Sequence, residues 1–490
     1  ILGVLSLFGC VDLKQEPLSF LTPENVSYDE SNMTTMANGL YRALWGWNYG
    51  YCCRLFTLTL GADDVIAGQL SKTRVIVIDE LRADATISEL DVKYFWTNMY
   101  NLILNSNLMI EGISGSSGSF EEKKPYLGEA YFMRAFAYYN LVRIFGDVPA
   151  IIDSKSAQDV LGNENIGRNR VADIYDKIIV PDLIMAEEYL PEVPRTRDNS
   201  SVGKIAAQTC LSEVYLTMAG WPLKRTEYYA KAAEKAKQII EASYNTHRLV
   251  EHYEDLWKEV MKSDNTEHIF AINCSRLNSM ASQYGISFLA MEENGWSDYL
   301  ADEAFYLKYP DDERKAFNYK TTYNRAGRPG QTIIVPYTQS TMKSPFINKY
   351  RDYGTDAAQS DGIIPIYRYA DVLLIYAEAQ NLANNGPDDL AYRCINDVRK
   401  RATGGTPNDI PENLSGEDFD KYVFDERGWE FFAEFKRWFQ LVRREKVEEC
   451  NRYNSRVVEA GYIDRNKENY LMPLPPKEVE LAKFPQNAGY

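Results

Sequence analysis

Histidine, cysteine and acidic residues are the side chains of this sequence that could support metal or acid–base chemistry. Only three histidines occur among 490 residues, and two of them, His247 and His252, stand five positions apart. On a helix this spacing would separate the two side chains by about 140° around the axis. The spacing fits no helical pair of zinc ligands, so no metal site is expected.

Acidic residues are abundant, and two adjacent pairs stand out, Asp63–Asp64 and Asp311–Asp312. Such pairs can ligate calcium or cap a helix N-terminus, and we favour capping. We expect no cofactor, and the binding of a structural calcium ion is left open. The sequence contains no G-x-S-x-G, Walker or G-x-G-x-x-G motif. A carboxylate pair of the glycosidase type could still lie among the 70 acidic residues, so a glycoside hydrolase is not excluded.

A further charged group lies in DERGWEFFAEFKRWFQLVRREK, residues 425–446. Apolar residues recur there every three or four positions, which predicts one helix with a core-facing stripe. On such a helix Glu430, Glu434 and Arg437 are i+3 and i+4 neighbours. We therefore interpret them as structural ion-pair partners and not as catalytic groups.

Most of the elements that would position these groups are predicted to be helices. The segment GEAYFMRAFAYYNLVRIFGDVPAI, residues 128–151, leaves little polar surface, so its helix should be buried nearly all round. Gly146 should end that helix, and Pro149 prevents its resumption. Residues 211–240 and 370–398 resemble helical hairpins of about the tetratricopeptide length, with unrelated helix pairs as the alternative. The predicted fold class is mostly α, with tetratricopeptide-like helical hairpins scaffolding a loop-rich region.

The pattern divides the chain into three main regions. Residues 33–243 form an N-terminal helical region, with a short strand predicted at Arg74 to Ile78. Residues 244–365 alternate aromatic, polar and turn-forming residues, which predicts an irregular insertion carrying candidate ligand loops. Residues 366–490 form a C-terminal helical region that ends in a proline-rich, extended tail.

Charge and cysteine content exclude some classes of function. The formal net charge of -16 disfavours binding to nucleic acid. The seven cysteines match no disulfide framework and no zinc ligand set. Four of them are expected to be buried as small apolar side chains, namely Cys210, Cys274, Cys394 and Cys450.

The first ten residues, ILGVLSLFGC, have the composition of a signal-peptide hydrophobic segment that stops at a cysteine. Leu7, Gly9 and Cys10 resemble the lipobox of bacterial lipoproteins, although Phe8 is bulkier than the usual residue. This resemblance implies that residues 1–9 are the remnant of a signal peptide, that Cys10 is lipidated, and that residues 10–32 contain a polar tether. The alternative is an ordinary buried N-terminal element.

Four segments resemble, in order, signature blocks of the SusD/RagB family. They are GEAYFMRAFAYYNLVRIFGDVPAI, YRYADVLLIYAEAQN, ERGWEFFAEFKRWFQLVR, and LMPLPPKEVE followed by FPQNAGY. The resemblance covers essentially the whole chain. It implies a lipoprotein displayed on the outer membrane of Bacteroidota, which captures glycans without catalysis and delivers them to a SusC-like TonB-dependent transporter. Some members of the family bind peptides instead.

The signature blocks concern the fold, so the ligand site has to be predicted from chemistry. Sugar rings stack on aromatic side chains, and their hydroxyls pair with amide, carboxylate or guanidinium groups. Two loop clusters offer such residues: Trp47, Asn48, Tyr49 and Tyr51 after the first helix, and Tyr284, Trp296, Asp298 and Tyr299 in the insertion. The leading hypothesis is a cell-surface oligosaccharide-binding lipoprotein. A peptide-binding member of the family, a lipid-anchored glycoside hydrolase and a scaffold that binds only the transporter are the alternatives.

Overall fold

The computed structural model describes most of the chain. The described residues are 27–46, 50–51, 55–68, 73–82, 91–156, 167–196, 198–326, 331–350, 360–451, 467 and 470–490. Within these ranges, no helix combines the length and the apolar character that a membrane span requires.

The N-terminal region is built mainly from long helices. Its elements are α1 (Glu30–Leu44), β1 (Trp45–Gly46), β2 (Gly50–Tyr51), α2 (Leu55–Leu58), β3 (Val65–Ala67), α3 (Thr73–Asp79), α4 (Asp91–Gly115), α5 (Phe120–Phe145), α7 (Val171–Ile174), the π-helical turn η2 (Tyr175–Ile179), α8 (Val180–Tyr189), α9 (Lys204–Ala219) and α10 (Tyr228–Glu241). The first helix begins inside the predicted tether range, because the Asp29 side chain caps it by accepting a hydrogen bond from Asn32 N–H.

Short elements replace long helices in the insertion. They are η3 (Tyr253–Leu256), η4 (Glu259–Met261), β4 (His268–Asn273), α11 (Tyr284–Phe288), η5 (Met291–Glu293), β5 (Tyr299–Ala301), α12 (Glu303–Lys308), α13 (Glu313–Asn318), β6 (Tyr319–Lys320), β7 (Thr322–Ala326), β8 (Thr332–Pro336), η6 (Tyr337–Gln339), β9 (Phe346–Ile347) and β10 (Ile363–Arg368). All described strand pairs are antiparallel and two-stranded: β1–β2, β3–β5, β4–β10, β6–β9 and β7–β8.

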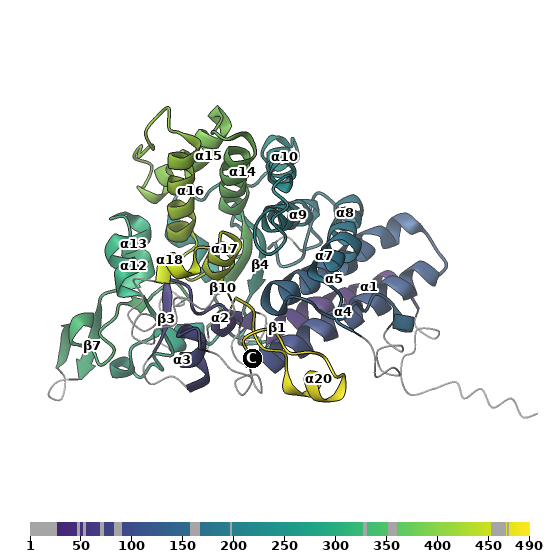
Figure 1. The fold of residues 1–490 in the computed structure, drawn as a ribbon, viewed down its shortest axis with the longest axis horizontal. Coiled ribbons are helices and arrows are strands. Elements are labelled where there is room, and N and C mark those ends of the chain that lie inside the picture. The colour runs from purple at the N-terminus through teal and green to yellow at the C-terminus, as the bar shows by residue number, and fades with distance from the viewer. Residues whose placement is uncertain are drawn as a thin grey trace, which may run out of the picture.

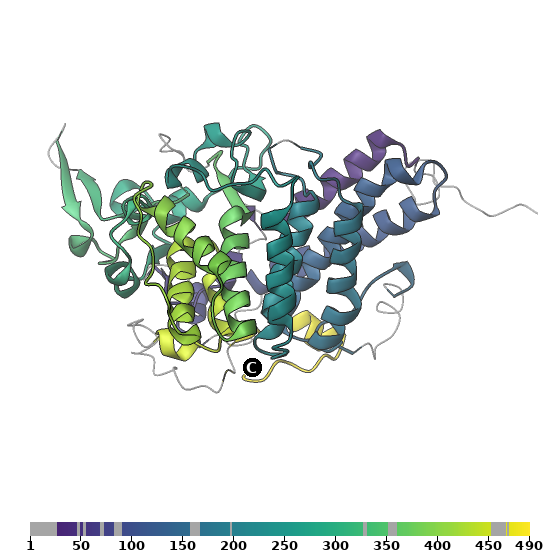
Figure 2. The same cartoon turned by 90° about the horizontal axis from the view of Figure 1, so that it is seen from above.

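Helices return in the C-terminal region, as α14 (Tyr369–Asn384), α15 (Asp389–Ala402), α16 (Gly416–Glu430), α17 (Arg437–Arg443), α18 (Val447–Asn451) and α20 (Pro476–Leu481). The two predicted hairpins are confirmed as α9–α10 and α14–α15, and α10 also packs against α14. Most of the helices lie along one side of the molecule, and the β7–β8 hairpin projects at one end (Figures 1 and 2).

Helix α5 lies at the centre of the N-terminal region and is buried on nearly all sides, as predicted. Gly146 ends it with φ of 73°, a conformation that glycine adopts without steric cost. The C-terminal segment covers this end of the helix. Asn487 Nδ2 donates to the carbonyls of Phe145 and Met472, at 3.0 and 2.7 Å, and Arg168 also donates to Phe145 O. The final residues therefore satisfy carbonyl groups that the end of α5 leaves open.

Two local predictions are wrong. Residues 74–78 lie in helix α3 and not in a strand, because a short apolar run fits either structure and its packing against α2 and β3 decides. Residues 425–446 do not form one helix, since α16 stops at Glu430 and α17 starts at Arg437. In the turn between them Ala433 and Phe435 adopt positive φ values of 56° and 64°.

The turn between α16 and α17 is held by polar groups from elsewhere in the chain. Lys349 Nζ donates to Phe432 O at 2.6 Å, and the Tyr350 hydroxyl donates to Ala433 O at 3.0 Å. Asp64 Oδ2 accepts from Ala433 N–H at 3.1 Å. These bonds replace the helical hydrogen bonds that a continuous helix would have made.

The acidic pairs also differ from the prediction in part. Asp312 caps α13 by accepting hydrogen bonds from Arg314 and Lys315 N–H, so capping is confirmed there. Asp63 instead forms a two-bond ion pair with Arg437, at 2.7 and 2.9 Å, and Asp64 contacts the turn described above. In the described ranges, no group of three or more His, Cys, Asp or Glu side chains could hold a metal ion.

A buried network of ion pairs joins the insertion to the C-terminal helices. Its centre is Arg368, which is fully buried at the junction of β10 and α14. Its guanidinium donates to Glu267 at 2.7 Å and to Glu434 at 2.9 and 3.0 Å, and it also donates to Glu430. Arg401 donates a further hydrogen bond to Glu267, and Arg314 donates one to Glu430, both at 2.8 Å. The predicted structural role of Glu430 and Glu434 holds, but their partners come from other elements and not from their own helix.

The network yields a prediction for stability. Replacing Arg368 with Met leaves three buried carboxylates short of a partner, so the free energy of unfolding should fall by roughly 3–5 kcal/mol. Urea denaturation followed by circular dichroism measures this change. Lys421→Met is the control, because Lys421 makes only exposed ion pairs and its removal should change the unfolding free energy far less. An Arg368→Met variant as stable as the unmodified protein would contradict the network's role.

A second prediction concerns acid. Burial alone would raise the pKa of Glu434, but the charges of Arg368 and Lys349 outweigh burial and lower this pKa to about 2. An unfolded glutamate titrates at about pH 4.3, so the stability that Glu434 contributes is complete above that pH and is lost as the pH falls toward about 2. Between pH 7 and pH 3, the urea midpoint of the unmodified protein should fall more steeply with acid than the urea midpoint of Glu434→Gln. Equal slopes would show that Glu434 contributes nothing to acid sensitivity.

Candidate ligand-binding site

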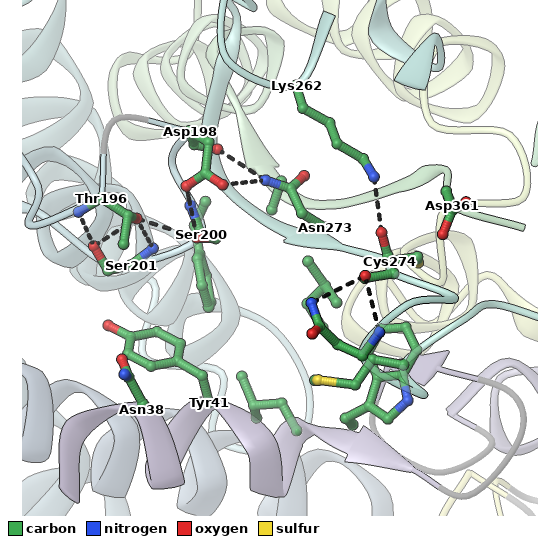
Figure 3. Close-up of a pocket in the computed structure, with 18 of the residues that line it drawn as sticks. Asn38, Tyr41, Thr196, Asp198, Ser200, Ser201, Lys262, Asn273, Cys274 and Asp361 are labelled. Carbon is green, nitrogen blue, oxygen red and sulfur yellow. Dashed lines mark hydrogen bonds between the residues drawn. The ribbon is translucent and has the colours of Figure 1, made fainter. Parts of the chain in front are cut away.

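A hollow of about 530 Å³ opens beside the C-terminal end of α1. Its walls come from α1 and Trp45, from the loop at 195–201, and from β4 with the turn that follows it (Figure 3). The polar lining residues are Asn38, Tyr41, Arg195, Thr196, Asp198, Ser200, Ser201, Glu259, Lys262, Asn273, Ser275, Asn278 and Asp361, and the apolar ones include Leu44, Trp45, Phe270, Ile272, Leu277 and Met280.

Helix α1 forms the base of the hollow and fixes the neighbouring loop. Ala37, Leu40 and Leu44 turn one face of α1 into the core, which leaves Asn38 and Tyr41 on the side of the hollow (Figure 3). The Tyr41 hydroxyl accepts a hydrogen bond from Val202 N–H at 2.9 Å. The loop at 195–201 is therefore attached directly to α1.

One wall of the hollow is a loop stabilised by its own hydroxyl groups. Thr196 and Ser201 each donate a backbone N–H to the other's hydroxyl, both at 2.8 Å. Asp198 accepts from Ser200 Oγ at 2.6 Å and from Asn273 Nδ2 at 2.9 Å. Burial favours the neutral acid, but these bonds outweigh it and lower the pKa of Asp198, so the group is a carboxylate at neutral pH.

The opposite wall is the turn that follows β4. Ser275 and Met280 pair their backbones, and Lys262 Nζ donates to Cys274 O at 2.8 Å. Asp361 holds the turn through Arg276 Nε at 2.5 Å. Leu277 stands at the tip of this turn with 94% of its surface exposed.

The hollow offers polar groups that the described protein does not use. Asn38 is exposed and makes no side-chain hydrogen bond to the rest of the described chain. Asn273 Oδ1 also has no donor there, but it is buried, so a ligand could reach it only after a local movement. Amide donors and acceptors beside the apolar surfaces of Trp45 and Leu277 can hold a polyhydroxylated or peptide-like ligand by hydrogen bonding and apolar contact.

The first predicted cluster lies mostly outside the described residues. Trp47, Asn48 and Tyr49 are not described, and only the backbone of Tyr51 is described, in β2 opposite Trp45. Trp45, which directly precedes the cluster, lines the hollow. The prediction that these residues bind ligand stays a prediction.

The second predicted cluster is divided by the structure. Tyr284 has no exposed surface and packs on Phe288 and Tyr350, with ring centroids 5.7 and 5.6 Å apart. Tyr299 is 5% exposed, and its hydroxyl lies 2.6 Å from that of Thr57. Neither ring has a face that a ligand could reach, so these two residues belong to the core. In the sequence, an aromatic residue of an irregular segment looks the same whether its ring packs in the core or binds a ligand.

Trp296 and Asp298 are the accessible members of the second cluster. Trp296 is 39% exposed, and Asp298 is half-buried. The loop that carries them is fixed by backbone bonds from Trp296 N–H to Ile286 O at 2.9 Å and from Gly68 N–H to Asp298 O at 2.8 Å. Neither residue lines the hollow, so they form a separate candidate surface, here named the Trp296 surface.

Sequence reasoning missed the residues that line the hollow, including Asn38, Asp198 and Asn273. The run RTRDNSS at 195–201 was the one available signal, because several hydroxyl, amide and carboxylate groups follow one another there. Nothing in the sequence placed that run against α1 and β4.

The sequence of this chain matches family models and known proteins. A model of the SusD family matches residues 194–490, and a second model, described as starch-binding and associating with the outer membrane, matches residues 61–216. The SusD-like protein P2 of Formosa agariphila is 30% identical across 99% of this chain and 98% of its own length. A SusD-like protein of Bacteroides ovatus is 28% identical across 71% of this chain and 64% of its own length.

Solved structures agree with the fold. The crystal structure of a SusD homolog from Bacteroides thetaiotaomicron gives a TM-score of 0.84 at 22% identity, with 96% of this chain and 98% of that chain covered. Surface glycan-binding protein A from the same species, in complex with laminarihexaose, gives a TM-score of 0.71 at 19% identity, with 94% and 99% covered. The predicted mostly helical, tetratricopeptide-like fold is confirmed. The match over 194–490 and the full-length similarity to a SusD-like protein show that the chain belongs to the SusD family.

Proposed function

We propose that this protein is a non-catalytic, cell-surface lipoprotein that binds oligosaccharides and delivers them to a SusC-like TonB-dependent transporter. The observation that carries the proposal is the hollow beside α1, which combines the unused, exposed amide of Asn38 with aromatic and aliphatic surface. Sugar rings need both kinds of contact, because their hydroxyls form hydrogen bonds and their C–H faces pack on apolar groups.

Family membership supports this proposal. Structural neighbours include proteins described as a laminarin-binding SusD-like protein and a surface glycan-binding protein. One of the two family models that match this chain is described as associating with the outer membrane. From this family relationship we extend the proposal to outer-membrane attachment through a lipid at Cys10 and to transfer of the ligand to a transporter.

The hollow favours a neutral ligand, because most of its charged groups already have partners in the protein. Asp198 accepts hydrogen bonds from Ser200 and Asn273, Asp361 pairs with Arg276, and Lys262 donates to a backbone carbonyl. A strongly charged ligand would have to compete with these bonds. Neutral sugar hydroxyls can instead use the remaining donor and acceptor positions.

A peptide is the second candidate ligand, and the exposed Leu277 favours it. An aliphatic side chain at the edge of a hollow suits an apolar peptide side chain as well as a sugar face. Titration calorimetry with a panel of hexasaccharides and a panel of peptides separates the two. Incubation of the purified protein with the same glycans, followed by product analysis, tests the glycoside-hydrolase alternative.

Two different variants test the hollow and the Trp296 surface as the sugar-binding site. If the hollow holds the sugar, Asn38→Ala should weaken hexasaccharide binding about 5- to 10-fold, because one hydrogen bond contributes roughly 1 kcal/mol. If the Trp296 surface stacks on the sugar, Trp296→Ala should weaken binding by a similar factor. Calorimetry of both variants measures these changes.

Controls for this experiment are available on α4. Asn105→Ala and Tyr94→Ala remove exposed side chains of the same classes from positions outside both surfaces. Neither control should alter affinity. An unchanged dissociation constant for Asn38→Ala would remove the hollow from the proposal, and the same result for Trp296→Ala would remove Trp296.

Membrane attachment is tested through Cys10. Replacing Cys10 with Ala removes the thiol that would carry the lipid, so the full precursor should move from the membrane fraction to the soluble fraction of cells. Replacing Cys210 with Ala is the matched control, since Cys210 is buried in α9. Continued sedimentation of Cys10→Ala with membranes would count against lipidation.

A further inference from the structure

A second cavity, of about 660 Å³, lies mainly in the C-terminal half and is separate from the hollow on which the proposed function rests. It is formed by α12, α16 and α18, which are neighbours in Figure 1, together with Asp63 and Arg437. We name it the α12–α16 cleft. It shares no lining residue with the hollow beside α1.

A buried ion pair and aromatic rings give the cleft a fixed shape. Arg437 is buried, pairs with Asp63 through two hydrogen bonds, and lies over the Phe424 ring with 4.6 Å from its guanidinium carbon to the ring centroid. The centroid of the Phe305 ring lies 5.7 Å from the same guanidinium carbon. The cleft therefore exists before any ligand arrives, and a ligand would not have to order it.

Trp429 supplies an aromatic wall with an unused donor. It is half-buried on α16 and lines the cleft, and its carbonyl is fixed by the Tyr309 hydroxyl at 2.5 Å. Its indole N–H has no acceptor in the part of the chain that the structure describes. An indole that presents both a ring and a free N–H suits a sugar, which offers a C–H face and hydroxyl oxygens.

Two carboxyl groups complement the indole. Asp425 lies one helical turn before Trp429 on α16 and accepts no hydrogen bond from another described residue. Asp302 caps α12 by accepting from Phe305 N–H at 2.8 Å and is 6% exposed. Burial raises the pKa of Asp302 to about 7, and the carboxylates of Asp63 and Asp64 add to the shift. Near neutral pH this carboxyl group can therefore donate as well as accept a hydrogen bond.

The charges of the cleft favour a neutral ligand. Five acidic and four basic side chains line it, so charges of both signs surround any occupant. An anionic ligand would meet five acidic groups, and a cationic ligand would meet four basic ones. A neutral polyol can accept from the cations and donate to the carboxylates at the same time.

We propose that the α12–α16 cleft is a second binding site for a neutral sugar unit, so that one protein molecule holds a polysaccharide at two places. This inference rests on the proposed glycan-binding function. Two sites on one chain raise the affinity for a long polymer well above that for a short oligosaccharide, because binding at the second site becomes intramolecular.

The test uses the full mature protein and two probe sizes. Laminarihexaose with laminarin, maltohexaose with starch, and xylohexaose with xylan form the first panel. With the glycan that binds, calorimetry should give two hexasaccharides per unmodified chain and one per chain for Trp429→Ala. Affinity electrophoresis should show that Trp429→Ala weakens binding to the matching polysaccharide at least about 10-fold.

Further variants distinguish a loss of binding at the cleft from a loss of folding. Asp425→Asn removes an exposed carboxylate that makes no hydrogen bond to the described chain, so it should weaken the same site in a chain that keeps its thermal unfolding midpoint. Tyr94→Ala, on α4, is the control for an aromatic residue outside both cavities and should leave both binding measurements unchanged. Combining Asn38→Ala with Trp429→Ala should weaken polysaccharide binding more than either change alone.

The outcomes separate this inference from the proposed function. One hexasaccharide per unmodified chain, with Trp429→Ala and Asp425→Asn binding polysaccharide as tightly as that chain, overturns the second site and leaves the proposed function standing. Absence of binding to every glycan in the panel overturns both. Two hexasaccharides per chain, reduced to one by the cleft variants, establish the second site.

Discussion

Arg368 carries a positive charge to a position with no access to water, and much of the structure around it serves to balance that charge. Its partners are Glu267 from the insertion and Glu430 and Glu434 from the end of α16 and the turn that follows. A buried charge without a partner costs several kcal/mol, so these segments can only meet in the arrangement that pairs them. This requirement joins the helical scaffold to the insertion and interrupts the helix that would otherwise run from 425 to 446.

The same principle of satisfying buried polar groups operates at the other end of the scaffold. Helix α5 ends at Gly146, and its last carbonyls are taken by Asn487 and Arg168. Many of these groups come from the four signature blocks. The first contains the C-terminal part of α5, the second contains Arg368, the third contains Glu430 and Glu434, and the last contains Asn487. Their shared role in fixing the scaffold explains in physical terms why they identify the fold, although one of them also contributes Trp429 and Arg437 to the α12–α16 cleft.

Both cavities are assembled from side chains whose charges are largely balanced locally. Beside α1, Asp198 and Asp361 are held by hydrogen-bond donors of the protein, and in the α12–α16 cleft Asp63 is held by Arg437. What remains for a ligand is a set of amide, indole and carboxyl groups next to aromatic or aliphatic surface. Binding through such groups needs shape and hydrogen-bond complementarity more than charge.

The sequence by itself determined the helical hairpins, the nearly complete burial of α5, its end at Gly146 and the family, because these depend on local periodicity and on contiguous motifs. It also indicated that Glu430 and Glu434 are structural. Only the tertiary structure decided that α16 stops at Glu430, that residues 74–78 are helical, that Tyr284 and Tyr299 are core residues, and that Asn38, Asp198 and Asn273 share one hollow. The physical reason is that each of these outcomes depends on partners far away in the chain, whose contacts outweigh local preference and leave no mark on the spacing of neighbouring residues.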